Sequence, residues 1–287
     1  HRRSSAASDV YKRQTLGLSD LIRVPLPAAK IIAEKLINRR LDLEIGNILT
    51  YAQSKLNSLT IDCLLLQSLR FLGNEMKSIV FDLDGTLADT SKDMLKAANL
   101  CFEEMGHSEV LSEEKHRGTA LHGGRAMLTK GLSILNEPDQ ANIISEYYPK
   151  FLKYYKENLY EKTVFYEGAI FCVESMLQKG WNVGICTNKP ESLANLLLTK
   201  MSAKGYFKSV VGADTLSVRK PNPEPFFETV KQLNGTLSLS CMIGDSVTDY
   251  KTAKAAGVPI ILVDFPPNDT EINLSLIHIS EPTRQHH

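Results

Sequence analysis

Asp82 and Asp84 are the first residues whose types and spacing could support catalysis. They lie two positions apart in the run VFDLDGT, and side chains two apart on an extended segment project to the same side. Two carboxylates that face one ligand repel each other unless a cation or a proton lies between them. Mg²⁺ suits that position because it prefers hard oxygen ligands and keeps coordination sites for phosphate and water. A plain Asp-Gly turn is the alternative interpretation.

A second pair of carboxylates, Asp245 and Asp249, lies in the run GDSVTDYKTAKAAGV. Its apolar spacing predicts a helix that stops at Gly257, and residues four apart share one face of the first turn. An acidic helix N-cap is the alternative, but it explains one aspartate better than two. Beside the first pair, we expect these carboxylates to contribute to the same metal site.

Lys220 and the pair Thr187 and Asn188 could bind a phosphoryl group. Lys220 lies in RKPNPEPF, where prolines stiffen the entry to a predicted helix. A lysine is usually a solvated charge, but beside several carboxylates it could neutralise charge on a transferred phosphoryl group. Thr187 and Asn188 could donate hydrogen bonds to the same oxygens, and strand-end capping is their alternative role. The sequence holds no nucleophile-elbow, P-loop or zinc-protease motif.

Four short apolar runs place these residues at the ends of predicted strands. Each run is continuous rather than alternating, which indicates parallel strands covered on both faces, and helical segments lie between them. Ligands bind at the carboxyl ends of such strands. The predicted fold class is therefore α/β with a parallel sheet. The runs are Ile79–Phe81, Val183–Cys186, Cys241–Ile243 and Ile260–Val263, and the last is followed by Asp264.

The composition excludes several classes of function. The chain has 287 residues, of which 43% are hydrophobic, and its 33 basic residues match its 33 acidic ones. No net charge therefore favours nucleic acid or an anionic membrane, and no apolar stretch is long enough to span a bilayer. The five cysteines are scattered, which indicates free thiols in a reducing compartment. We expect a cytoplasmic protein without nucleic-acid or membrane partners.

The two ends of the chain differ from the rest. Residues 1–14 and 274–287 are similar to in-frame translations of sequencing-library adapters, and we expect them to be non-native tails. Residues 15–75 are either a helical extension or upstream sequence read in frame before Met76. Both interpretations stay open.

The runs VFDLDGT, ICTNKP, RKPNPEPF and MIGDSVTD, in this order, resemble the haloacid dehalogenase superfamily over about Met76 to Asp264. The resemblance implies a Rossmann-like core, which we expect to comprise residues 76–89 and 163–273. Dehalogenases of that superfamily lack the second aspartate of the first run and need no Mg²⁺, so the resemblance favours a phosphatase that forms a phosphoaspartate.

The same resemblance implies a role for each matched residue. Asp82 corresponds to the nucleophile and Asp84 to the general acid and base. Thr187 corresponds to the phosphate-binding hydroxyl and Lys220 to the charge clamp. The implied Mg²⁺ is held by Asp82, the carbonyl oxygen of Asp84 and Asp245, with Asp249 as a supporting residue.

A helical cap is predicted between the first two runs. One hundred residues separate Thr86 from Thr187, too many for one crossover, and two helical stripes lie among them. They predict an all-helical cap over residues 90–162, similar to the small helical caps of the superfamily. The stripes are Met94, Leu95, Ala98, Phe102 and Met105, and Ile143, Ile144, Tyr147, Phe151, Tyr155 and Leu159.

One run in the cap, RGTALHGGRAML, could determine the substrate specificity. Glycines let a backbone approach a ligand and a guanidinium can grip a carboxylate, whereas the alternative is a helix–helix turn with solvated arginines. This run, VFYEGA and VVGADTLSVRKPNPEPF resemble phosphoglycolate phosphatases. That resemblance implies that Arg125 or Arg117 binds the carboxylate of 2-phosphoglycolate, a small phosphorylated metabolite. A sugar-phosphate phosphatase, a phosphomutase and a non-catalytic binding protein on the same fold remain alternatives.

Overall fold

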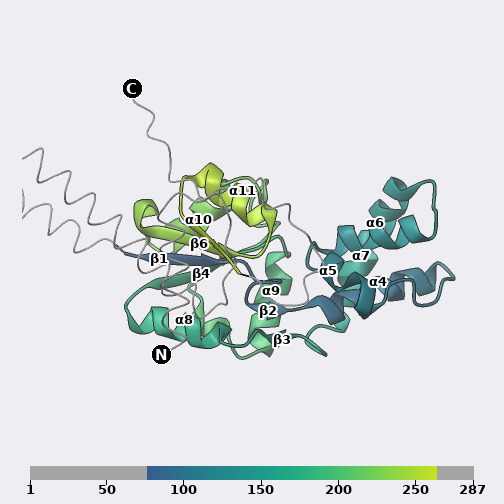
Figure 1. Ribbon diagram of the computed structural model, residues 1–287, viewed down its shortest axis with the longest axis horizontal. Helices are drawn as coiled ribbons and strands as arrows, with labels where there is room; N and C mark the ends of the chain where they lie inside the picture. The colour runs from purple at the N-terminus through teal and green to yellow at the C-terminus, as the bar shows by residue number, and fades with distance from the viewer. Residues whose placement is uncertain (1–75, 264–287) are drawn as a thin grey trace, which may run out of the picture.

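Five parallel strands form the central sheet of the computed structural model, which describes residues 76–263 (Figure 1). The strand order is β5-β4-β1-β6-β7, so the predicted α/β parallel sheet is confirmed. Three of the four predicted runs lie wholly in strands and the fourth extends one residue past β7, to Val263, whereas the short strand β5 was not predicted. The strands are β1 (Ser78–Phe81), β4 (Asn182–Cys186), β5 (Ser209–Val211), β6 (Ser240–Gly244) and β7 (Ile260–Leu262). The expected tails, residues 15–75 and Asp264 lie outside the described residues.

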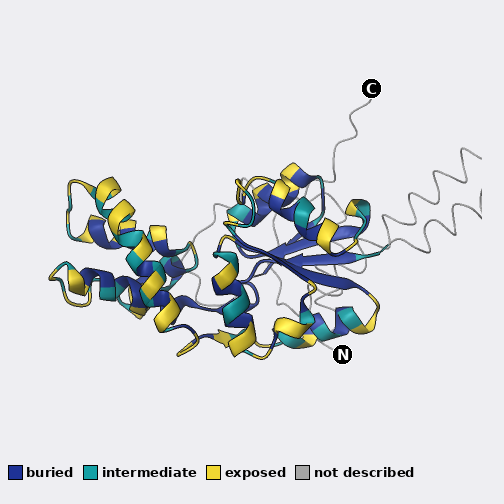
Figure 2. Ribbon diagram, turned by 180° about the vertical axis from the view of Figure 1, so that it is seen from behind, coloured by how far each residue is buried: buried dark blue, intermediate teal, exposed yellow. Residues whose placement is uncertain are grey.

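Helices cover both faces of the sheet, which explains why its strands are buried throughout. Val80 packs in one cluster with side chains of α10 (Glu224–Gln232) and α11 (Val247–Ala256). Ile79 and Phe81 point to the other face and pack in the cluster that includes α8 (Ala169–Gln178) and α9 (Glu191–Lys200). Figure 2 shows the strands as buried ribbons between these helices. The sheet is therefore a rigid base for residues that follow its strands.

A segment of four helices is inserted between β1 and β4, as predicted, and lies beyond one end of the sheet (Figure 1). Its first and last helices pack against each other. Their buried faces carry the predicted stripes, with Phe102, Phe151 and Tyr155 almost fully buried. Hereafter these helices are called the cap: α4 (Ser91–Glu104), α5 (Glu113–Ala120), α6 (Gly124–Ile134) and α7 (Gln140–Glu157).

The two chain segments that join the cap to the core run side by side. Strand β2 (Ala88–Asp89) pairs with β3 (Val164–Phe165) in a small antiparallel sheet. Asp93 in the first turn of α4 reinforces this junction, because its carboxylate accepts hydrogen bonds from Lys162 N at 2.8 Å and Thr163 Oγ1 at 2.7 Å. The sequence did not predict this sheet, since each of its strands has only two residues.

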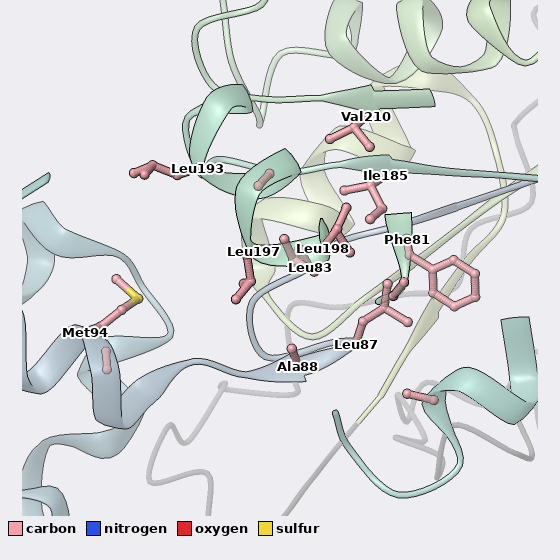
Figure 3. Packing of buried hydrophobic residues seen from close by; sticks show 14 of the residues in the cluster. Phe81, Leu83, Leu87, Ala88, Met94, Ile185, Leu193, Leu197, Leu198 and Val210 are labelled. Carbon is pink, nitrogen blue, oxygen red and sulfur yellow. The ribbon is translucent and has the colours of Figure 1, made fainter. Parts of the chain in front are cut away.

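Apolar packing continues from the sheet toward the cap. Figure 3 shows Phe81 and Ile185 of the sheet near Leu87 and Leu197, with Met94 of α4 farther along. One buried cluster includes side chains from the sheet and the cap, so the two parts share a core. None of the helices between residues 76 and 263 is long and apolar enough to cross a membrane.

Gly131 in α6 provides a test of cap packing. An alanine normally stabilises a helix relative to glycine, but a Cβ at this position would lie 2.1 Å from Phe102 Cζ. We expect Gly131→Ala to lower the free energy of unfolding by about 1–3 kcal/mol, measured by urea denaturation. Gly205→Ala is the matched control, because no heavy atom lies within 4 Å of its added Cβ. A Gly131→Ala protein as stable as this control would contradict the packing.

Candidate active site

The carboxyl ends of three adjacent strands carry the predicted polar residues. Asp82 follows β1, Thr187 follows β4 and Asp245 follows β6. In a parallel sheet these ends meet at one edge. Carboxylate oxygens of Asp82, Asp245 and Asp249 lie within 4.8 Å of one another there, and all three residues are buried. The structure thus brings together carboxylates from the two ends of the core sequence.

The turn after β1 brings Asp82 close to Asp245. Gly85 has φ of +83°, and a Cβ on it would lie 2.4 Å from Asp245 Oδ2, so this position requires glycine for both its conformation and its contact. Thr86 Oγ1 donates a hydrogen bond to Asp245 Oδ1 at 2.7 Å. The Asp-Gly turn that was the alternative interpretation is therefore present, and it brings Asp82 and Asp245 together. Thr86 is a supporting residue that sequence reasoning missed.

Asp249 holds the start of α11 and the site together. Its Oδ2 accepts hydrogen bonds from Ser246 N and Oγ, while Ser246 Oγ accepts one from Asp249 N, which is a capping box. The prediction that Asp245 and Asp249 share the first helical turn is wrong for Asp245, because Ser246 is the N-cap and Asp245 precedes the helix. The two carboxylates still converge, since the strand end and the helix start are adjacent.

Lys220 lies between two of these carboxylates. Its Nζ is 3.0 Å from Asp82 Oδ1 and 2.6 Å from Asp249 Oδ1, and its side chain is only 2% exposed. Burial lowers the pKa of Lys220, but the carboxylates of Asp249 and Asp82 outweigh it and hold the pKa above its usual range. Lys220 therefore stays charged next to Asp82, as a charge clamp requires.

The acidic residues retain excess negative charge despite this lysine. Burial raises the pKa of Asp82 to about 7, with Asp249 and Asp84 adding to the rise and Lys220 opposing it. Burial, followed by the charges of Asp249 and Asp82, raises the pKa of Asp245 well above its usual value. Because burial is the largest cause, these shifts mark carboxylates whose lost hydration is not fully replaced by nearby positive charge.

A divalent cation fits this arrangement. The described residues at the sheet edge supply four carboxyl groups but only two ammonium groups, those of Lys189 and Lys220. With all four carboxyl groups ionised, two negative charges remain without a counter-charge. Both oxygens of Asp249 already accept hydrogen bonds, so Asp82 and Asp245 are the side chains best placed to hold the ion. An all-oxygen set of this kind suits a hard cation.

Asp84 is held by a lysine that sequence reasoning missed. Lys189 Nζ lies 3.0 Å from Asp84 Oδ1 and 3.0 Å from Tyr155 Oη. Burial lowers the pKa of Lys189, but the charge of Asp84 and the interaction with the Tyr155 hydroxyl outweigh it and raise the pKa above its usual range. Lys189 follows Thr187 and Asn188 in the run ICTNKP, so its place at a strand end was the signal that could have identified it.

Thr187 and Asn188 lie at the cavity, where a phosphate group could contact them. Thr187 is buried, and its Oγ1 accepts a hydrogen bond from Lys189 N at 3.2 Å. Asn188 is exposed, and its Nδ2 donates to the Lys220 carbonyl oxygen at 3.1 Å. Both residues line the cavity described next.

A cavity of about 320 Å³ lies between the strand ends and the cap. This volume suits a small ligand. Its core side includes Asp82, Asp84, Thr187, Lys189 and Lys220, and its cap side includes Leu121, His122, Gly123, Gly124, Arg125, Tyr148, Phe151 and Tyr155.

The two arginines of the cap run have different surroundings. Arg125 lines the cavity, is exposed, and lies 4.1 Å from the centroid of the Tyr148 ring. Arg117 is not among the lining residues and instead forms an ion pair with Asp89 of β2. The glycine at 124 has a packing role, because a Cβ there would lie 2.1 Å from Phe151 Cε1. Arg125 is thus the cap arginine that can reach a ligand.

Comparison with known proteins identifies the family. The family model described as haloacid dehalogenase-like hydrolase matches residues 79–263. The chain belongs to this family. It is 34% identical to a phosphoglycolate phosphatase of Mesorhizobium japonicum, over 68% of this chain and 85% of the relative. It is 32% identical to a phosphoglycolate phosphatase of Rhodospirillum rubrum, over 66% of this chain and 80% of the relative.

Solved structures of the family share the fold. A predicted phosphoglycolate phosphatase from Haemophilus somnus superposes with a TM-score of 0.62 at 22% identity, covering 70% of this chain and 92% of that one. A hydrolase of the superfamily from Geobacter sulfurreducens gives a TM-score of 0.53 at 24% identity, covering 67% and 89%. The α/β core with its helical segment is thus the family's fold.

Cation binding can be measured without any assay of activity. A ligand that binds only the folded state at 100 times its Kd adds about 2.7 kcal/mol of stability, so we expect saturating Mg²⁺ to raise the melting temperature. Asp245→Asn should abolish most of this rise, because it removes a ligand charge. Asp139→Asn, at the exposed start of α7, should keep it. Equal rises in both variants would show that the cation binds elsewhere.

Proposed function

We propose that this protein is a Mg²⁺-dependent phosphatase that hydrolyses a small phosphomonoester through a phosphoaspartate on Asp82. The observation that carries this proposal is the pairing of two carboxylates with two buried lysines: Asp82 with Lys220, and Asp84 with Lys189, each at 3.0 Å. Bound Mg²⁺ would neutralise negative charge on the phosphoryl oxygens.

In the first step, Asp82 attacks phosphorus. Its Oδ1 is held by Leu83 N at 2.8 Å and by Lys220, whereas no residue in the described part of the chain donates a hydrogen bond to Oδ2, which is free to attack. The new O–P bond forms as the ester O–P bond breaks, and Asp84 gives its proton to the leaving oxygen. Lys220 stabilises the charge that spreads over the transferred group.

In the second step, water attacks the phosphoryl group. Asp84, now a carboxylate, takes a proton from that water, the bond between phosphorus and Asp82 breaks, and inorganic phosphate leaves. Cap residues form one wall of the cavity in which this water attacks. A binding protein without catalysis would not need both Asp82 and Asp84 at this edge, so the geometry favours an enzyme.

2-Phosphoglycolate is the substrate we propose. Relatives named phosphoglycolate phosphatase match the chain at 34% and 32% identity over most of their length, the cavity suits a small ligand, and Arg125 can pair with a carboxylate there. Sugar-phosphate hydrolysis and phosphomutase activity are the other outcomes that a substrate panel distinguishes. We do not propose Arg117 as a ligand of the substrate carboxylate, because it already forms an ion pair with Asp89.

The nucleophile is tested with a panel of phosphomonoesters in the presence and absence of Mg²⁺. We expect phosphate release from 2-phosphoglycolate to exceed that from sugar phosphates, and chelation of the cation to abolish it. Asp82→Asn removes the attacking oxygen and should reduce kcat by at least about 10⁴-fold, since no other group replaces a covalent nucleophile. Asp139→Asn is the control. Full activity of Asp82→Asn would refute the assignment, and a preferred sugar phosphate would refute only the substrate.

Arg125 is tested by comparing substrates with and without a carboxylate. A charged hydrogen bond contributes about 1.5–3 kcal/mol, so Arg125→Gln should lower kcat/KM for 2-phosphoglycolate by about 10- to 100-fold. An alkyl phosphate without a carboxylate should lose less than about 3-fold, because it never forms that bond. Lys130→Gln, an exposed cation on the same helix, controls for net charge. Equal losses for both substrates would contradict carboxylate recognition.

A further inference from the structure

Only one carboxylate oxygen of Asp84, Oδ1, has hydrogen-bond partners among the described residues. Its Oδ1 accepts a hydrogen bond from Thr90 Oγ1 at 2.7 Å and pairs with Lys189 Nζ at 3.0 Å. No residue in the described part of the chain donates a hydrogen bond to Oδ2. One oxygen is therefore fixed by two donors, which leaves the other to exchange a proton with substrate or water.

Lys189 is in turn held by the cap. Its Nζ donates a hydrogen bond to Tyr155 Oη at 3.0 Å and lies 4.4 Å from the centroid of that ring. Tyr155 is 1% exposed and stacks on Phe151 at 6.2 Å between ring centroids. The side chain of Lys189 is only 3% exposed, so its ammonium group depends mainly on Asp84 and Tyr155 for hydrogen bonds.

Both ends of the cap are thus linked to Asp84, one directly through Thr90 and the other through Lys189. Thr90 immediately precedes α4, the first cap helix, and Tyr155 lies near the end of α7, the last one. We propose that Lys189 is a positioning residue that orients Asp84 for proton transfer, and that Tyr155 makes this orientation depend on the cap being in place. The inference rests on the proposed function, because it assigns a proton to Asp84.

A second role for Lys189 must be distinguished from this one. An ammonium group has three donors, and Lys189 uses two on Asp84 and Tyr155, so the third could contact a phosphoryl oxygen of the substrate. A phosphate contact helps all phosphate esters alike. Orientation of Asp84 helps only those whose leaving oxygen needs a proton.

The leaving group therefore separates the two roles. When the ester O–P bond breaks, the electron pair stays on the leaving oxygen. An alkoxide is a strong base and takes the proton of Asp84, whereas a nitrophenolate is stable without one. The quantity to compare is kcat/KM, which reports the steps up to the first P–O cleavage.

The experiment measures kcat/KM with 2-phosphoglycolate, or the best alkyl ester of the panel, and with p-nitrophenyl phosphate, both with Mg²⁺. General acid catalysis contributes about 10²–10⁴-fold. We expect Lys189→Met to lose about 100-fold or more with the alkyl ester and less than about 10-fold with the nitrophenyl ester. Tyr155→Phe keeps the ring but removes the hydroxyl. We expect its kcat/KM to fall by about 10-fold with the alkyl ester and by about 2-fold with the nitrophenyl ester.

Tyr154→Phe is the matched control, because its hydroxyl bonds Glu104 Oε2 on the exposed side of the same helix. It should change both values by less than about 2-fold. Thermal melting identifies any unfolded variant, and Tyr155→Phe tests the inference if Lys189→Met does not fold.

Equal losses with the two esters in folded Lys189→Met and Tyr155→Phe would overturn the positioning role while leaving the proposed function intact. Absence of turnover of either ester by the unaltered protein would overturn the proposed function and this inference together.

Discussion

The buried ion pair between Lys220 and two carboxylates is the interaction on which the site depends. Asp82 and Asp249 come from the two ends of the core sequence, and each would be costly to bury without a counter-charge. Removing one partner of such a pair typically costs about 3–5 kcal/mol. Because Lys220 precedes α10, its position also fixes how that helix lies against the two strand ends. The ion pair of Lys220 with Asp82 and Asp249 thus stabilises the fold and forms part of the candidate site.

The remaining charges are arranged around that contact. Gly85 allows the first turn to touch Asp245, and the capping box of α11 aims Asp249 at Lys220. Burial, together with the charges of the neighbouring carboxylates, raises the pKa of Asp82 and Asp245. A divalent cation held by Asp82 and Asp245 would offset the repulsion between these carboxylates.

The positions of the residues at the strand ends could be predicted from the sequence, because a single rule determines them. Continuous apolar runs identify buried parallel strands, and polar residues directly after them must meet at one edge. That rule placed Asp82, Thr187 and Asp245 correctly without any coordinates. Predictions for the helical segment also held, because its stripes have helical spacing over several turns.

Features that depend on tertiary contacts were not predicted. Strands β2, β3 and β5 have two or three residues, too few to show a period. Lys189 contacts both Tyr155 and Asp84, which are distant from it in the chain, so only the fold brings these three residues together. The two cap arginines looked equivalent in sequence, and only the fold pairs Arg117 with Asp89 and leaves Arg125 at the cavity.

The most direct test of the central claim is to look for the phosphoryl group on Asp82 itself. The enzyme would be mixed with an alkyl ester carrying ³²P, quenched in acid within milliseconds, digested and analysed by mass spectrometry. We expect an acid-stable label that hydroxylamine releases, on a peptide containing Asp82. Steady turnover of the ester with no labelled enzyme, or with the label on any other residue, would contradict it.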